Sequence, residues 1–270
     1  MAESAPTSSA APRGGGSAVA TPPGSRRLDV ALVERGLAPS RERAQSLIAA
    51  GLVRVGDAVA RSASQRVTDE TGLAVTGRDH QWASRGGVKL VAALDGFGVS
   101  VAGRVCLDAG ASTGGFTDVL LSRGASLVYA VDVGYGQLIH RLASDRRVRV
   151  LDRTNLRLLR SLPGAPPSLV TLDLSFISLR LVLHRVAALA AGRAEVIALV
   201  KPQFELGRDR VGKGGVVRDQ AAGEAAAAEL VDWAAASLRA SREGMLRSPI
   251  TGQKGNVEWL VHLGLPGDGA

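Results

Sequence analysis

Short apolar runs and segments with helix-spaced apolar residues alternate along most of the chain after residue 100. Runs of this length are typical of buried strands, and strands that alternate with helices are typical of a parallel sheet covered by helices on both faces. The sequence therefore predicts a Rossmann-like α/β domain with seven strands over residues 88–264, which begins with a helix over 88–97. The predicted strands are centred near Val105, Val128, Val148, Val170, Val196, Leu246 and Val261.

A smaller α+β module is predicted over residues 26–79. Helices are expected over residues 28–36 and 41–50, because each helix-spaced run ends at a glycine. Ser40 is the expected N-cap of the second helix, since its hydroxyl can accept a hydrogen bond from the first turn. Short strands are expected near residues 52–55, 59 and 73–75.

The remaining segments are predicted to lie outside these two domains. Residues 1–25 contain mostly Ala, Ser, Pro and Gly, a composition typical of a disordered extension. Residues 80–87 are the expected linker, in which Trp82 anchors packing or contacts a cofactor, and the first role is favoured. Residues 265–270 are expected to form a tail.

The composition narrows the class of protein. The 270-residue chain has a formal net charge of +8, which favours a polyanionic partner such as nucleic acid. Its single cysteine, Cys106, excludes internal disulfides and fits a reducing cytoplasm, where we expect the protein to act. Apolar stretches are too short to span a bilayer, and the scattered histidines have no metal-ligand spacing, so neither membrane nor metal is expected. We expect a monomer.

A glycine-rich turn from Asp108 to Thr117 joins the first predicted strand of the larger domain to a helix. Such a turn can hold a nucleotide cofactor, because glycines let a ligand approach backbone N–H groups closely. Asp132 ends the next strand and is placed to hydrogen-bond a ribose diol. Asp108 favours a ligand that also carries a cationic amino group, as S-adenosylmethionine does. An ordinary tight turn between strand and helix is the alternative interpretation.

Charged residues also follow other predicted strands. Asp173 and Lys201 come directly after the fourth and fifth strands, and Asp152 and Arg153 follow the third. Ligands bind beyond the carboxyl ends of parallel strands, and a charged residue buried there without a partner is costly. We therefore expect Asp173 and Lys201 to neutralise each other at the edge of a cleft.

Three motifs of the smaller module, Arg27-Leu-Asp29, Ser40-Arg-Glu-Arg-Ala44 and Gly51-Leu-Val-Arg-Val-Gly56, resemble those of the S4 RNA-binding domain. The resemblance implies that this module binds RNA. Arg41 and Arg43 lie beside the N-terminus of the second helix, where backbone donors add to the attraction for phosphate. A surface helix with solvated arginines is the alternative interpretation.

Lys89 and Glu258 complete a set of four charged residues with Asp173 and Lys201. The set resembles the catalytic tetrad of 2′-O-ribose methyltransferases of the FtsJ/RrmJ type. This resemblance implies that Lys201 orients a ribose 2′-hydroxyl or accepts its proton, while Asp173 tunes Lys201. Lys89 and Glu258 would then position the ribose and hold the lysines in place. Two structural salt bridges are the alternative interpretation.

Further motifs resemble the TlyA family over essentially all of residues 26–264. Membership implies S-adenosylmethionine-dependent 2′-O-methylation of cytidine in 16S or 23S ribosomal RNA, or in both. It also implies that ribosomal subunits are partners and that susceptibility to capreomycin-type antibiotics is affected. Proteins of this family have also been called haemolysins. The motifs include Ser84-Arg-Gly-Gly87, Val131-Asp-Val-Gly134, Arg153-Thr-Asn155, Asp173-Leu-Ser-Phe176, Val200-Lys-Pro-Gln-Phe204 and Lys213-Gly-Gly-Val-Val-Arg218.

The expected site residues follow from the turn, the strand ends, the charge pattern and these resemblances. The expected cofactor-binding residues are Asp108, Gly110, Ser112, Thr113, Gly114, Gly115, Phe116, Asp132, Asp152 and Arg153. The expected RNA-binding residues are Arg27, Arg41, Arg43, Arg85, Arg208, Arg210, Lys213 and Arg218. The last four lie in a predicted loop over residues 203–220, which precedes a helix over 221–240. A merely flexible, solvated loop is an equal alternative.

Three other functions compete with a methyltransferase. A non-catalytic S4-domain protein that binds ribosomes is disfavoured, because every expected cofactor and catalytic position is filled. A haemolysin-like, membrane-active protein would need a longer amphipathic or apolar segment than this sequence contains. A nicotinamide-dependent dehydrogenase is disfavoured by the four charged residues and by Ser112, which replaces the middle glycine of the dinucleotide fingerprint.

Overall fold

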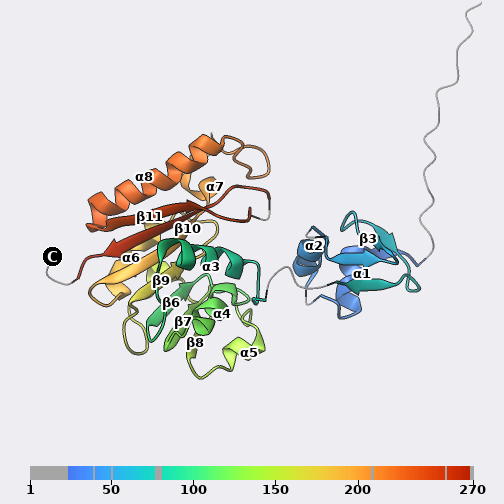
Figure 1. The fold of residues 1–270 in the computed structure, drawn as a ribbon, viewed down its shortest axis with the longest axis horizontal. Helices are drawn as coiled ribbons and strands as arrows, with labels where there is room; N and C mark the ends of the chain where they lie inside the picture. The colour runs from blue at the N-terminus through green and yellow to red at the C-terminus, as the bar shows by residue number, and fades with distance from the viewer. Residues whose placement is uncertain are drawn as a thin grey trace, which may run out of the picture. The chain divides into compact units, whose positions relative to one another are not determined.

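The computed structural model describes residues 24–38, 40–49, 51–76, 81–207, 210–252 and 254–267. Its chain divides into two compact units, residues 1–79 and 80–270 (Figure 1). Most of the predicted extension over residues 1–25 lies outside the described residues.

Within its described residues the smaller unit contains two helices and short strands, as predicted, and the strands pair antiparallel. Its elements are β1 (Arg26–Arg27), α1 (Leu28–Glu34), α2 (Arg41–Ala49), β2 (Val53–Val55), β3 (Ala58–Val59), β4 (Arg66–Val67) and β5 (Leu73–Val75). Leu28 and Leu32, one helical turn apart, share a core with Leu47. The Ser40 hydroxyl accepts a hydrogen bond from the Arg43 N–H at 3.2 Å, which confirms the predicted N-cap. The pairing of β1 with β4 was not predicted.

The larger unit contains all seven predicted strands in one sheet. The strands are β6 (Val105–Ala109), β7 (Leu127–Val131), β8 (Val148–Leu151), β9 (Leu169–Leu172), β10 (Ala194–Val200), β11 (Ser241–Arg247) and β12 (Trp259–Leu265). The helices are α3 (Gly86–Phe97), α4 (Gly115–Ser122), α5 (His140–Ala143), η1 (Leu156–Leu158), α6 (Arg180–Leu189), α7 (Pro202–Glu205) and α8 (Gln220–Leu238). The strand order is β11-β12-β10-β9-β6-β7-β8 (Figure 1).

The prediction of an all-parallel sheet is wrong for one strand. β12 pairs antiparallel with both β10 and β11, whereas the pairs from β10 to β8 are parallel. The chain passes from β11 to β12 through a loop instead of a crossover helix, and a return of this kind reverses the strand direction. β12 therefore lies between β10 and β11, and its first residue reaches the edge of the sheet where β10 ends.

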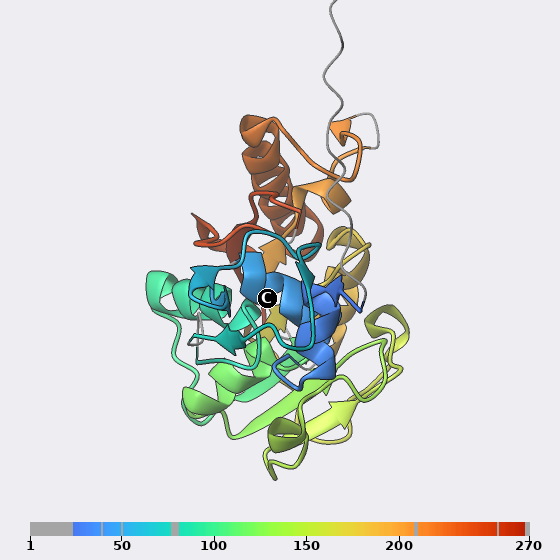
Figure 2. The same ribbon diagram turned by 90° about the vertical axis from the view of Figure 1, so that its right-hand side faces the viewer.

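Helices cover both faces of this sheet (Figures 1 and 2). Successive strand side chains point to opposite faces, so Leu107 and Tyr129 belong to one core and Cys106 and Val128 to the other. The first core lies against α6 and α8, and the second lies against α3, α4 and α5. Each layer thus holds the ends of the strands in fixed positions.

Helix α3 starts earlier than predicted. It begins at Gly86, so the last two residues of the predicted linker are helical. Trp82 is half-buried and packs against the core beneath α3 and α4, which agrees with an anchoring role. Among the described residues, no helix has both the length and the apolar character that crossing a lipid bilayer requires.

Candidate active site

The glycine-rich turn lies between the carboxyl end of β6 and the start of α4. Gly110 and Gly114 adopt left-handed backbone angles, with φ of 85° and 102°. A Cβ atom at Gly110 would lie 2.5 Å from the carbonyl oxygen of Asp173. Only glycine fits this position without strain, and the turn therefore approaches the end of β9 closely. Ser112, at the exposed tip, is also left-handed with φ of 46°.

Asp108 lies beneath this turn. It has no exposed surface, and Thr117 Oγ1 donates a hydrogen bond to its Oδ2 at 2.6 Å. Burial raises the pKa of Asp108 to about 7, although the hydrogen bond from Thr117 acts in the opposite direction. Asp108 therefore supports the turn from below, and its direct contact with a cofactor amino group stays a prediction. The Phe116 side chain is also buried, in the core under the turn.

Asp132, at the end of β7, connects the turn to the next loop. Its Oδ2 accepts the Ser112 N–H at 2.8 Å, and its Oδ1 accepts the Gly134 N–H at 2.7 Å. Asp152, after β8, accepts the Gly136 N–H at 2.8 Å. Backbone donors thus fix both carboxylates at one edge of the sheet.

Arg153 is exposed beside these carboxylates. Its backbone is left-handed, with φ of 51°, and its guanidinium lies 4.3 Å from the centre of the Tyr135 ring. The Arg153 N–H donates to the Gly134 carbonyl at 2.8 Å. The loops after β6, β7 and β8 therefore meet around the predicted cofactor-binding residues.

The register of the sheet assembles three of the four predicted catalytic residues. Val200 of β10 pairs with Trp259 of β12, so Lys201 lies opposite Glu258 just beyond the pair. β9 lies on the other side of β10, and Asp173 follows its last residue. The three side chains consequently come from the ends of adjacent strands.

The four predicted catalytic residues form two ion pairs. Lys201 Nζ lies 2.7 Å from Asp173 Oδ1, and Lys89 Nζ lies 2.5 Å from Glu258 Oε2. The Lys89–Glu258 pair is buried, with exposed side-chain fractions of 10% and 3%. In the other pair the Asp173 side chain is 22% exposed, so solvent reaches this carboxylate more easily.

Helix α3 brings Lys89 to the same region as Asp173. A Cβ atom at Gly86, one turn before Lys89, would lie 3.6 Å from Asp173 Oδ2. Asp173 in turn lies against the glycine turn through Gly110. The ion pairs and the turn therefore occupy neighbouring positions at one edge of the sheet, as a group-transfer site between two substrates requires.

Comparison with known proteins identifies the family. A model described as FtsJ-like methyltransferase matches residues 82–265, and a model described as S4 domain matches residues 26–72. The chain is 49% identical to the 16S/23S rRNA (cytidine-2'-O)-methyltransferase TlyA of Mycobacterium tuberculosis, over 88% of this chain and 89% of that protein. This chain belongs to the TlyA family of FtsJ-like methyltransferases.

Other relatives agree with this family. The chain is 44% identical to YqxC of Bacillus subtilis, a candidate rRNA methyltransferase, over 90% of this chain and 87% of that protein. The solved structure of a candidate hemolysin from Streptococcus thermophilus has a TM-score of 0.73 and 40% identity, and the match covers 92% of this chain and 90% of that one. The predicted fold class and family are therefore confirmed.

Two further residues of this methyltransferase border the tetrad and were not assigned from the sequence. Ser175 Oγ accepts a hydrogen bond from Lys201 Nζ at 2.8 Å. Phe176 is 90% exposed and left-handed, with φ of 64°, and its ring centre lies 5.2 Å from that of Phe204. Exposure and backbone strain in one aromatic residue are uncommon and concentrate at functional sites. The signal was present in the Asp173-Leu-Ser-Phe176 motif directly after a strand.

The predicted loop over residues 203–220 is partly helical in this methyltransferase. Pro202 starts the short helix α7, because its fixed φ suits the first helical position. Glu205 then accepts hydrogen bonds from Ser178 Oγ at 2.6 Å and the Leu179 N–H at 2.8 Å, which fixes α7 against the start of α6. Asn256 is buried, and its side chain accepts the Val217 N–H at 2.9 Å, so the loop is also held near its end at Val217.

The predicted RNA-binding residues of this protein lie in both units. Arg41, Arg210, Lys213 and Arg218 are exposed. Arg27, Arg43 and Arg85 are partly exposed, and Arg208 lies outside the described residues.

Proposed function

We propose that this protein transfers a methyl group from S-adenosylmethionine to the 2′-hydroxyl of a cytidine in ribosomal RNA. The observation that carries the proposal is the pair of lysine–carboxylate contacts beside the glycine turn. The specified nucleoside comes from the name of the TlyA relative. The S4 domain and the net charge of +8 support an RNA substrate.

The residues around the turn fit the proposed cofactor. Gly110 and Gly114, both left-handed, have no side chains, so a cofactor can approach the backbone of the turn closely. Asp132 offers a carboxylate to the ribose diol of the cofactor. Thr113, Gly115, Asp152 and Arg153 would complete the walls. When bound, S-adenosylmethionine would supply a sulfonium methyl group, whose carbon is the electrophile for a nucleophilic oxygen and whose sulfur leaves as a neutral thioether.

The tetrad is suited to activate a ribose hydroxyl. A hydroxyl is a weak nucleophile until its proton is removed and the developing negative charge is stabilised. In its ion-paired form Lys201 orients the hydroxyl and stabilises the developing negative charge, and only a neutral Lys201 amine would accept the proton; its contacts with Asp173 and Ser175 fix its Nζ. Lys89, held by Glu258, provides a second cation and positions the ribose. The exposed Phe176 ring offers a face for the base of the target nucleotide.

Methyl transfer to purified ribosomal subunits tests the proposal. Subunits from cells that lack this gene would be incubated with protein and tritiated S-adenosylmethionine, and the modified ribose would be mapped by mass spectrometry. We expect incorporation at a cytidine, and its loss in Lys201→Ala with cofactor affinity retained in calorimetry. Arg123→Ala, which removes an exposed cation paired with Asp95, is the control and should remain active.

Other outcomes support the competing functions. Absence of cofactor heat in calorimetry would favour a protein that only binds ribosomes through its S4 domain. Leakage of liposomes on addition of the pure protein would favour a membrane-active function.

A further inference from the structure

Among the described residues of the smaller unit, one carboxylate is fully buried, that of Asp29 in helix α1. Arg27 donates to Asp29 from Nε at 2.9 Å and from Nη2 at 3.1 Å. Arg41 Nη2 donates to Oδ2 at 3.2 Å, and Gln45 Nε2 donates to the same oxygen at 2.8 Å. The Val30 N–H completes the set at 3.0 Å. Two arginines from different elements, β1 and α2, therefore converge on one buried carboxylate.

Asp29 is ionised at neutral pH. The hydrogen bond from Arg27 holds the pKa of Asp29 well below its usual range and outweighs the opposing effect of burial. A buried ion pair is weak evidence for a gain in stability, because desolvation offsets much of the attraction. A gain in stability therefore does not by itself explain why Arg27 and Arg41 contact buried Asp29, which indicates a second role.

Both arginines remain open to solvent on their outer side. The Arg27 side chain is 42% exposed and the Arg41 side chain is 57% exposed, although Asp29 itself is covered. Asp29 uses Nε and Nη2 of Arg27 and only Nη2 of Arg41. Each guanidinium is thus held at one edge and presents its remaining donors to solvent, where a phosphate can accept them.

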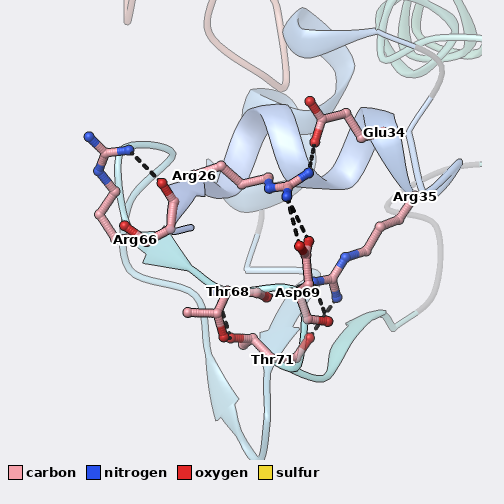
Figure 3. Close-up of polar contacts among 8 residues, drawn as sticks. Arg26, Glu34, Arg35, Arg66, Thr68, Asp69 and Thr71 are labelled. Carbon is pink, nitrogen blue, oxygen red and sulfur yellow. Dashed lines mark hydrogen bonds and ion pairs between the residues drawn. The ribbon is translucent and has the colours of Figure 1, made fainter. Parts of the chain in front are cut away.

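Other arginines of this unit are bound in a different way (Figure 3). Arg26 pairs with Glu34 and with Asp69, both on the surface. Arg35 donates to the backbone carbonyls of Thr68 and Thr71 at 2.7 and 2.6 Å, which ties α1 to the loop after β4. Both sets of contacts connect elements of the fold, but Arg26 and Arg35 use exposed carboxylates or backbone carbonyls, whereas the Asp29 contacts hold two guanidinium groups on one buried carboxylate.

We propose that Asp29 is a positioning residue, which orients Arg27 and Arg41 so that they receive RNA phosphates. The inference rests on the proposed function, because it assigns RNA as the ligand of this unit. Arginine side chains lose conformational entropy when a phosphate fixes them, and a side chain fixed in advance loses less. Asp29 thereby lowers the cost of binding without touching the RNA.

The variant Asp29→Asn distinguishes the positioning role from a simple effect of charge, because the two predict opposite changes in RNA binding. It keeps the size of the side chain and adds one unit of positive charge, so electrostatics alone would tighten RNA binding. Positioning instead requires the KM for ribosomal subunits to rise about fivefold or more, with kcat and cofactor affinity unchanged. Asp69→Asn makes the same charge change on the surface of the same unit and should bind RNA at least as well as wild type.

A second variant and a double-mutant cycle keep the test decisive. Asp29→Glu keeps the charge but moves the carboxylate, and it should also raise the KM for ribosomal subunits. This variant decides the test if circular dichroism shows that Asp29→Asn does not fold. In an Arg27→Ala, Arg41→Ala background, Asp29→Asn should change KM by less than twofold, because the residues that Asp29 orients are absent. An unchanged or lower KM in either folded single variant would overturn the positioning role.

Filter binding of ribosomal RNA separates this inference from the proposed function. If the wild-type protein transfers no methyl group, the proposed function fails. The ratio of RNA affinities between wild type and Asp29→Asn still reports on positioning, since it needs no catalysis. Equal affinities would overturn the positioning role even in an active enzyme.

Discussion

The two lysine–carboxylate pairs of the candidate active site differ in burial. Solvent barely reaches Glu258, whereas the Asp173 side chain retains 22% of its exposed surface. A substrate hydroxyl can therefore approach the Asp173 carboxylate more easily than the Glu258 carboxylate, whereas the two lysines are equally buried. We infer that the first pair acts on the hydroxyl and that the second acts mainly by holding Lys89.

Substitution of the two carboxylates should separate these roles. Glu258→Gln leaves Lys89 buried without a counter-charge, and we expect a loss of about 3–5 kcal/mol in the free energy of unfolding. Asp173→Asn should cost less stability, because Lys201 keeps its hydrogen bond to Ser175 and position 173 is partly exposed, and it should still reduce kcat at least a hundredfold. Urea unfolding and single-turnover methyl transfer measure both quantities. Equal losses of stability in the two variants would contradict this assignment.

Asp108 should make stability depend on pH. Its pKa is raised by burial to about 7 in the folded protein, well above the ordinary value that applies to the unfolded chain. Between these two values the folded state binds more protons, so Asp108 lowers stability as the pH rises through that window. We expect the gain in unfolding free energy from Asp108→Asn to be larger at about pH 8 than at about pH 5. A gain that is the same at both pH values in urea unfolding would contradict the shift.

The sequence indicated one of the two ion pairs directly and the other only through a resemblance. Asp173 and Lys201 follow apolar strands directly, and the prediction that they neutralise each other was correct. Lys89 and Glu258 are 169 positions apart, and only the resemblance to a known tetrad placed them in one site. The burial of Asp108 depends on the helices that pack on both faces of β6, so the residues next to it in sequence do not predict it.

At the scale of elements, the glycine turn and the end of β9 determine each other's position. Gly110 combines a left-handed backbone with close contact to the Asp173 carbonyl. A side chain at this position would displace the turn and Asp173 together. The predicted cofactor-binding turn and the predicted catalytic carboxylate are thus structurally coupled.

Gly110→Ala should therefore reduce both cofactor affinity and methyl transfer. Gly98→Ala, at the end of α3, is the matched control, since Gly98 is also left-handed but a Cβ there meets no atom within 4 Å. We expect Gly98→Ala to lose about 1 kcal/mol of stability through backbone strain alone and to keep its cofactor affinity. Calorimetry with S-adenosylmethionine compares the two variants. Equal affinities would show that the contact with Asp173 is unimportant.

The positions of the strands were predictable, whereas the direction of β12 was not. An apolar run indicates burial but contains no information about direction, which here depends on a loop rather than a helix between β11 and β12. Strands β1 and β4 have two residues each, too few for a periodic pattern. The helical turn α7 had a local signal in Pro202, although the surrounding glycines and arginines suggested a loop.

For the whole molecule, charge should govern how tightly RNA binds. The net charge of +8 and the exposed arginines favour contacts with phosphates, and such contacts release counterions. We expect the KM for ribosomal subunits to rise at least tenfold between about 50 and 200 mM salt, with little change in cofactor affinity. A KM that is independent of salt would argue against phosphate contacts.

Single arginines should change this salt dependence in different ways. Arg41→Ala should reduce the slope of log KM against log salt by about one, as expected for one lost phosphate contact. Arg26→Ala is the control, because Arg26 is engaged with Glu34 and Asp69 (Figure 3). Its slope should match that of the wild type. Equal slopes for all three proteins would remove Arg41 from the RNA-binding surface.

The place of β12 inside the sheet has a consequence for synthesis of the protein. β12 comes after every other strand in chain order, yet it separates β10 from β11 and begins directly after Glu258. A polypeptide still emerging from the ribosome with β12 inside the exit tunnel can complete neither its sheet nor its tetrad. On the proposed function, nascent chains would therefore be unable to modify the ribosome that is making them, and a nonsense codon just before Trp259 would give an inactive product.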